Sequence, residues 1–86
     1  MIAQLVPRRE DQVVEVDAAE RTVALNTRFP GDPPVILVGS VRRVWQLIDG
    51  VRTVADIAEM AGAPSTDAAA DFVAALVNAR LVSYED

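Results

Sequence analysis

Two aspartates are the side chains with the clearest potential for chemistry. Asp67 and Asp71 stand four residues apart in a segment with helical periodicity, so both carboxylates would share one face of a helix. Paired carboxylates can perform acid–base catalysis where a pocket tunes their pKa values. In the simpler interpretation, Asp67 places negative charge near a helix N-terminus, and Asp71 is solvated or contacts a partner.

The residue types that most catalytic and metal sites require are missing. The chain has 86 residues, with no Cys and no His. It therefore offers no thiol nucleophile, no imidazole base and few of the ligands that transition metals prefer. Ser40, Ser65 and Ser83 have no His partner, and the sequence contains no P-loop, dinucleotide fingerprint or calcium loop. We expect a protein that is not an enzyme and that uses no cofactor and no metal.

The composition indicates a small globular domain with an acidic surface. Apolar residues make up 51% of the chain, the net charge is -5, and every basic residue is an Arg. Such a charge repels nucleic acid and anionic membranes. The sequence has no signal-peptide pattern, and no apolar run approaches the roughly 20 residues that span a bilayer. We expect a cytoplasmic protein that binds neither nucleic acid nor membrane.

Three segments in the first half predict β-strands. Residues 12–17 and 21–26 alternate in polarity, and the short link between them predicts an antiparallel hairpin. Residues 27–34 contain three prolines and a glycine and predict a loop. The run at 35–39 has no polar alternation. It predicts a strand that is buried on both faces or that awaits a partner along one side.

The second half predicts three helices. The expected boundaries are an N-cap at Ser40 for a helix over 41–48 that ends at Asp49-Gly50, an N-cap at Thr53 for a helix that ends at Gly62, and an N-cap at Ser65 for a helix over 66–80. Arg42 and Arg43 fall on the outward face of the first helix, where they could meet an acidic peptide or enzyme surface, and Trp45 falls on its inner stripe. Strands followed by helices predict a winged-helix-like α+β fold, a three-stranded antiparallel sheet followed by three helices.

We expect a single domain over residues 1–86. Its parts are an N-terminal arm at 1–11, strands at 12–39, three helices at 40–80 and a C-terminal tail at 81–86. The start at Met1 and the stop at Asp86 favour a stand-alone protein over a domain of a larger modification enzyme. A winged-helix transcriptional regulator or a dimerisation module is an alternative. The two aspartates of the third helix, whose Arg80 lies at its far end, disfavour contact with DNA phosphates.

A series of short motifs runs through the second half of the chain. They are Trp45-Gln46-Leu47-Ile48-Asp49-Gly50, Thr53-Val54-Ala55-Asp56-Ile57, Asp71-Phe72, Leu76 and Leu81-Val82. In this order and spacing they resemble the PqqD-like family, the peptide chaperones of pyrroloquinoline quinone biosynthesis. The wider group is the RiPP recognition element of ribosomally synthesised and modified peptides, which includes the leader-binding proteins of lasso-peptide biosynthesis.

The resemblance implies both a fold and a function. Members of this group pack three strands on three helices and bind the leader segment of a precursor peptide. The leader adds as a further strand to the edge of the sheet, in a cleft beside the third helix, which is β-augmentation. The implied partners are a precursor peptide and the processing or modifying enzyme to which it is delivered.

The residues themselves agree with this expectation at two places. The apolar strand at 35–39 offers an edge, and small side chains on the third helix let a peptide backbone approach. The expected peptide-binding residues are Val35, Leu37, Val38, Gly39, Ala68, Asp71, Phe72, Ala75 and Asn78. For Val35, Leu37 and Gly39 an interior place in the strand is the alternative, and for Phe72 a place in the core.

Two departures from the family pattern remain. The Leu-Asn pair that often precedes the first helix lies one strand earlier here, at Leu25-Asn26, and Arg80 stands where Gly is common. The first departure leaves open which strand is the accepting edge.

Overall fold

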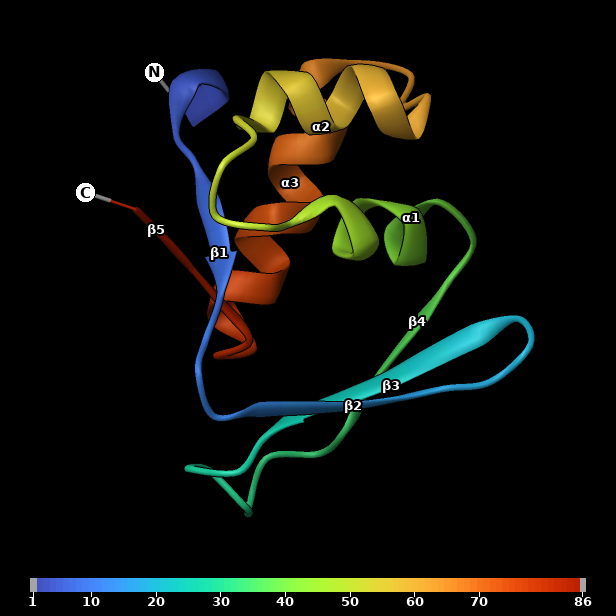
Figure 1. Cartoon of the computed structure of the whole chain (residues 1–86), viewed down its shortest axis with the longest axis vertical. Helices are drawn as coiled ribbons and strands as arrows, with labels where there is room; N and C mark the ends of the chain where they lie inside the picture. The colour runs from blue at the N-terminus through green and yellow to red at the C-terminus, as the bar shows by residue number, and fades with distance from the viewer. Residues whose placement is uncertain (1, 86) are drawn as a thin grey trace.

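The computed structural model of the chain describes residues 2–85. Its elements are η1 (Ile2–Gln4), β1 (Pro7–Arg9), β2 (Val13–Asp17), β3 (Arg21–Asn26), β4 (Val35–Val38), α1 (Gly39–Leu47), α2 (Val54–Ala61), α3 (Thr66–Asn78) and β5 (Val82–Tyr84). The predicted α+β fold is confirmed, with an antiparallel β2-β3-β4 sheet followed by three helices (Figure 1). Met1 and Asp86, at the ends of the predicted arm and tail, lie outside the described residues. No helix within the described range is long and apolar enough to cross a membrane.

The three-stranded sheet presents a partly polar face to the helices. Thr22, Ala24 and Asn26 of β3 point inward and are buried, as is Leu37 of β4. The helices contribute most of the remaining core, including Trp45 at 0% exposure. Figure 1 shows the helices on one side of this sheet, with the opposite side left uncovered.

A second, two-stranded sheet joins the ends of the chain, and the sequence did not predict it. β1 pairs antiparallel with β5, with Arg8 opposite Ser83. The arm is also bonded to the helices, because the N–H of Val54 donates to the carbonyl of Leu5 at 3.0 Å. The predicted N-terminal arm thus contains a paired strand, and it supports α2.

Most helix ends follow their local capping residues. Thr53 caps α2 as predicted: it accepts a hydrogen bond from the Asp56 N–H and forms a capping box with that residue. Ser65 caps α3 as predicted. The prediction for Ser40 was wrong, because α1 begins at Gly39, two residues before the predicted start at 41, and its N-cap is Val38, whose side chain makes no capping bond. Gly39 has a φ of 58°, which glycine adopts readily.

The C-terminal end of α3 also differs from its prediction. The helix stops at Asn78, two residues before the predicted end, because Arg80 adopts a left-handed φ of 65°. The N–H of Leu81 then donates to the carbonyl of Leu76, and that of Arg80 to Val77, which is a Schellman motif. Arg80 therefore occupies the conformation that glycine would favour.

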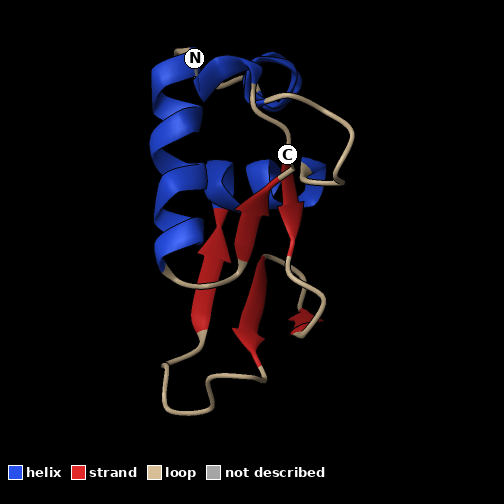
Figure 2. Cartoon of the chain, turned by 90° about the vertical axis from the view of Figure 1, so that its left-hand side faces the viewer, coloured by secondary structure: helices blue, strands red, loops and turns tan. Residues whose placement is uncertain are grey.

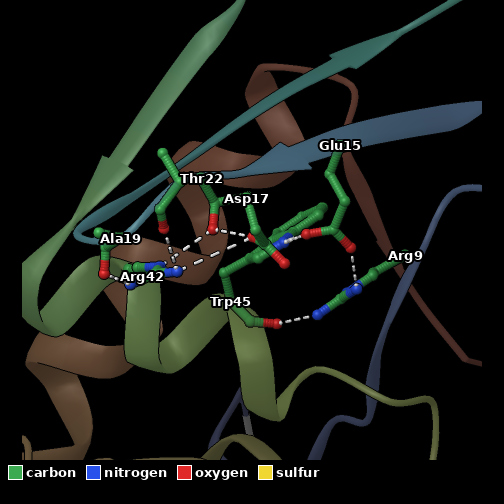
Figure 3. Close-up of polar contacts among 8 residues, drawn as sticks. Arg9, Glu15, Asp17, Ala19, Thr22, Arg42 and Trp45 are labelled. Atoms are coloured by element: carbon green, nitrogen blue, oxygen red, sulfur yellow. Dashed lines mark hydrogen bonds and ion pairs between the residues drawn. The ribbon is translucent and has the colours of Figure 1, made fainter.

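Trp45 connects α1, β1 and β2 through one polar cluster (Figure 3). Its indole Nε1–H donates to Glu15 Oε2 at 2.9 Å. Arg9 Nη1 donates to the other oxygen of Glu15 at 2.6 Å, and Arg9 Nη2 donates to the Trp45 carbonyl at 2.8 Å. The Arg9 guanidinium also lies 4.4 Å from the centre of the Trp45 ring. The cluster joins the two sheets across the first helix.

Replacing Glu15 with alanine should destabilise the fold. The change removes the acceptor of the buried indole N–H and one of the two acceptors of the Arg9 guanidinium, and we expect the free energy of unfolding to fall by about 1–3 kcal/mol. Urea denaturation followed by Trp45 fluorescence measures it. Glu20→Ala is the matched control, since Glu20 is exposed and makes no hydrogen bond or ion pair among the described residues. Equal stability of the two variants would contradict the role of the cluster.

Candidate functional site

β4 is an edge strand with one side unpaired among the described residues. It pairs with β3 in antiparallel register, with Leu37 opposite Thr22, and lies at one end of the sheet order. Figure 2 shows α3 on the same side of the molecule as β4. The free edge of β4 is therefore the edge that lies toward α3. β2 forms the other edge of this sheet.

The structure separates the predicted residues of β4 into two groups. Leu37 is 1% exposed and belongs to the core, and Val35 is half-buried against the same core. Ile36, which was not predicted to bind peptide, is 60% exposed, and Val38 is 52% exposed on the same face. Since Leu37 has its side chain in the core, it could contact a peptide only through its backbone. Gly39 is exposed at the start of α1.

Three of the predicted residues of α3 lie along its outer surface, whereas Phe72 packs against the core. Asp71, Ala75 and Asn78 are exposed, and Ala68 and Phe72 are half-buried. Asp71, Ala75 and Asn78 are spaced by four and three residues, so they follow one another along one stripe of the helix. The small Ala75 side chain leaves this stripe open to an approaching backbone.

A hollow of about 280 Å³ lies where the start of β4 meets the end of α3. It brings together Val35 and Asn78 of the predicted site. Arg80 borders it, 3.7 Å from Asp32 and with its guanidinium 4.0 Å from the centre of the Phe29 ring. The predicted loop at 27–34 therefore packs against the end of α3 and forms one wall of this hollow. The remaining predicted residues of α3 lie outside it.

A larger hollow of about 830 Å³ at the other end of β4 was not predicted as a site. Val38 and Gly39 line it together with Arg21, Arg42 and Arg43. Its walls come from the β2–β3 turn and from α1, which are about twenty positions apart in the chain, so no local motif marks it.

The expectation that Arg42 faces outward was wrong. Its guanidinium donates to Thr22 Oγ1 at 3.1 Å and to the carbonyls of Ala18 at 3.0 Å and Ala19 at 3.3 Å. Figure 3 shows this side chain folded against the hairpin. Arg42 therefore stabilises the turn and holds its charge at a fixed place in the larger hollow.

The motif residues between α1 and α2 have structural roles. The N–H groups of Arg52 and Val51 donate to Asp49 Oδ1 at 3.0 and 2.9 Å. These two bonds, with the nearby Arg52 guanidinium, hold the pKa of the Asp49 carboxyl below its usual value. Gly50 has a φ of 80°, which suits a glycine. The Asp-Gly motif thus fixes the turn that leads to Thr53.

The two aspartates of α3 are exposed to solvent and, among residues 2–85, do not line a pocket that would tune them for catalysis. Asp67 and Asp71 are both exposed. Acid–base catalysis usually relies on a pocket that excludes water and shifts a pKa toward neutrality. Tyr84 does have a raised pKa, because burial disfavours its ionised form, but it belongs to the β1–β5 sheet. The region around β4 and α3 therefore offers backbone groups, apolar side chains and surface charges, which suit recognition.

Comparison with known proteins identifies a solved structure with the same fold. No protein-family model matches the chain, and no curated protein matches it significantly. The structure of TbiB1 in complex with the TbiA(beta) leader peptide matches with a TM-score of 0.72 and 21% sequence identity. The match covers 92% of this chain and 99% of that chain. At this identity the likeness shows a shared fold, and the bound leader peptide is a property of TbiB1.

The two faces of β4 should respond differently to truncation. Leu37→Ala creates a cavity in the core, and we expect it to lower the free energy of unfolding by about 2–5 kcal/mol. Ile36→Ala removes an exposed side chain and should cost less than about 1 kcal/mol. Urea denaturation compares the two variants. Similar losses would show that the Leu37 side chain does not lie in the core.

Proposed function

We propose that this chain binds the leader segment of a ribosomally synthesised precursor peptide, and that the leader adds as a fourth strand to β4 beside α3. The observation that carries the proposal is the unpaired edge of β4 in a fold shared with TbiB1, a protein solved with a leader peptide. The chain would present the precursor to a modifying or processing enzyme and carry out no catalysis itself. The spacing of its motifs resembles the PqqD-like family and the lasso-peptide leader-binding proteins.

The composition of β4 supports its use as an accepting edge. Natural edge strands are usually protected against pairing by charged side chains, by proline or by a bulge. β4 reads Val-Ile-Leu-Val and has none of these devices. β2, the opposite edge, carries Glu15 and Asp17. An unprotected apolar edge is expected where a partner strand covers it in the working complex.

The surface of α3 is consistent with a leader peptide that lies between β4 and this helix. Val35 and Asn78 line one hollow, so an added strand would begin or end between β4 and the last turn of α3. Exposed Ala75 allows the backbone to approach, and the polar groups of Asp71 and Asn78 could bind polar groups of the leader. Backbone bonds would supply affinity, and specificity would come from side chains of the leader that enter this cleft.

The surface of α3 does not favour the alternative of a winged-helix regulator. A recognition helix presents basic or amide side chains to the phosphates and base edges of DNA. The exposed positions of α3 include Asp67 and Asp71. Carboxylates there would repel the phosphate backbone.

A fluorescence anisotropy titration tests the proposal directly. The probe is the labelled leader half of the precursor peptide encoded nearest to the gene for this chain. We expect saturable binding in the micromolar range or tighter. No binding by a protein that circular dichroism shows to be folded would refute leader recognition.

Strand addition predicts a periodic response to N-methylation of the leader. In an added strand, only every second N–H points at β4, so only alternate N-methyl groups remove a bond to the edge. A series of leaders, each with one N-methylated residue, should lose affinity with a period of two along the bound segment. The unmethylated leader is the reference. A uniform response, or none, would show that the leader binds by another mode.

A bulky residue on α3 should block the cleft. Ala75→Trp fills the space that the peptide backbone would occupy, and we expect leader affinity to fall at least about tenfold, equivalent to roughly 1.4 kcal/mol. Ala55→Trp is the matched control, because Ala55 is an exposed helical alanine on α2. Equal affinities of the two variants would place the leader away from this part of α3.

A further inference from the structure

The uncovered face of the three-stranded sheet is apolar across all three strands. The side chains on this face point away from the helices. They belong to Val14, Val16, Val23, Leu25, Ile36 and Val38. Exposure reaches 71% for Val16, 60% for Ile36 and 51% for Val14. We call these six residues the outer face. Contiguous apolar patches on a soluble protein commonly mark interaction sites.

Polar residues of the sheet lie on the side that packs against the helices, and the outer face on the uncovered side is apolar. The side that packs on the helices carries Glu15, Thr22 and Asn26, each of which makes a hydrogen bond there. The β-branched residues that usually fill a core therefore face outward. Core packing does not explain the outer face, because none of its residues belongs to the buried core.

Arg21 connects the outer face to the larger hollow at the end of β4, which we call the arginine-lined hollow. It lies directly opposite Val38 in the β3–β4 register, and both residues also line that hollow with Arg42 and Arg43. Arg21 makes no ion pair or side-chain hydrogen bond among residues 2–85, and the Arg43 guanidinium reaches only a carbonyl at 3.5 Å. A chain of net charge -5 thus gathers three of its guanidinium groups, with one carboxylate, Glu20, among them, at one end of an apolar face.

We propose that the outer face and the arginine-lined hollow form one docking surface for a second protein, which presents an apolar patch flanked by acidic side chains. This inference rests on the proposed function for the identity of that protein, an enzyme that acts on the bound precursor peptide. Apolar contact on the valines would supply affinity, and carboxylates opposite Arg21 and Arg43 would fix the orientation. The surface shares Val38 and Gly39 with the proposed leader site but leaves the hydrogen-bonding edge of β4 free, so leader and enzyme would bind at the same time.

Charge favours a different protein over a second copy of this chain, and size sets how far that protein must extend. Three strands about 4.8 Å apart and about five residues long give a face of roughly 250 Å². A stable complex buries about 800 Å² on each partner, so the partner must reach beyond this face. Stacking two copies face to face would place no carboxylate of the outer face opposite Arg21, since that face contains none.

The test measures enzyme binding and leader binding separately on the same variants. Each purified peptide-processing enzyme encoded beside the gene for this chain is immobilised in turn, and the binding of the chain is followed by interferometry. Val16→Ser removes an exposed apolar side chain on β2, far along the sheet from the free edge of β4. Arg21→Glu reverses the charge at the hollow. We expect each change to weaken enzyme binding at least about tenfold and to leave leader anisotropy within about twofold of wild type.

Two matched controls test whether losing any exposed valine, or reversing any exposed arginine, weakens enzyme binding. Val51→Ser removes a valine that is 78% exposed in the loop after α1, and Arg28→Glu reverses an exposed charge in the loop after β3. Both should bind the enzyme as the wild type does.

The possible results distinguish this inference from the proposed function. Absence of enzyme binding, or equal losses in the variants and their controls, would overturn the docking surface. Sedimentation that shows a dimer lost on Val16→Ser would assign the face to a second copy instead. A wild-type chain that binds an enzyme through this surface but binds no leader would refute the proposed function and support the docking surface.

Discussion

The buried indole of Trp45 imposes the constraint on which the rest of the structure depends. Its N–H requires an acceptor inside the protein, and Glu15 on β2 supplies one. A carboxylate at that position is in turn stabilised by a cation, and Arg9 provides it while stacking on the same ring. Because Arg9 belongs to β1, the contacts that satisfy one indole also fix the N-terminal arm and the position of the sheet over α1.

The same constraint decides which face of the sheet points inward. Side chains alternate along a strand, so placing Glu15 toward Trp45 forces Val14 and Val16 outward. A register slip of one residue would bury both valines, but it would also remove the acceptor from the indole and separate the Glu15 carboxylate from Arg9. In this sheet, the hydrogen bond that the buried indole requires therefore outweighs the burial of two valines. The apolar outer face is a consequence of that choice, and it leaves a surface that a partner can cover.

Local patterns predicted the elements whose determinants lie close together in the sequence. Alternation predicted the hairpin, and Thr53 predicted the start of α2, because each depends on residues a few positions apart. Long-range pairing was not predictable, since β1 reads Pro-Arg-Arg and becomes a strand only beside Val82–Tyr84. At the candidate site, an all-apolar strand shows no alternation. That Leu37 faces the core and Ile36 faces solvent follows from the register with β3, in which Leu37 lies opposite Thr22 across the intervening loop.

The edge and the outer face of β4 would contribute differently to recognition. Backbone bonds along an edge are the same for every peptide sequence, so selection must come from the side chains of the added strand. In a pleated sheet these side chains alternate, and half of them would extend the outer face beside Ile36 and Val38. An enzyme docked there would then contact the leader as well as the chain, over a footprint wider by about 4.8 Å, one strand spacing. By linkage, leader and enzyme would each raise the affinity for the other. Because this coupling arises from a shared surface, it requires no conformational change in the chain.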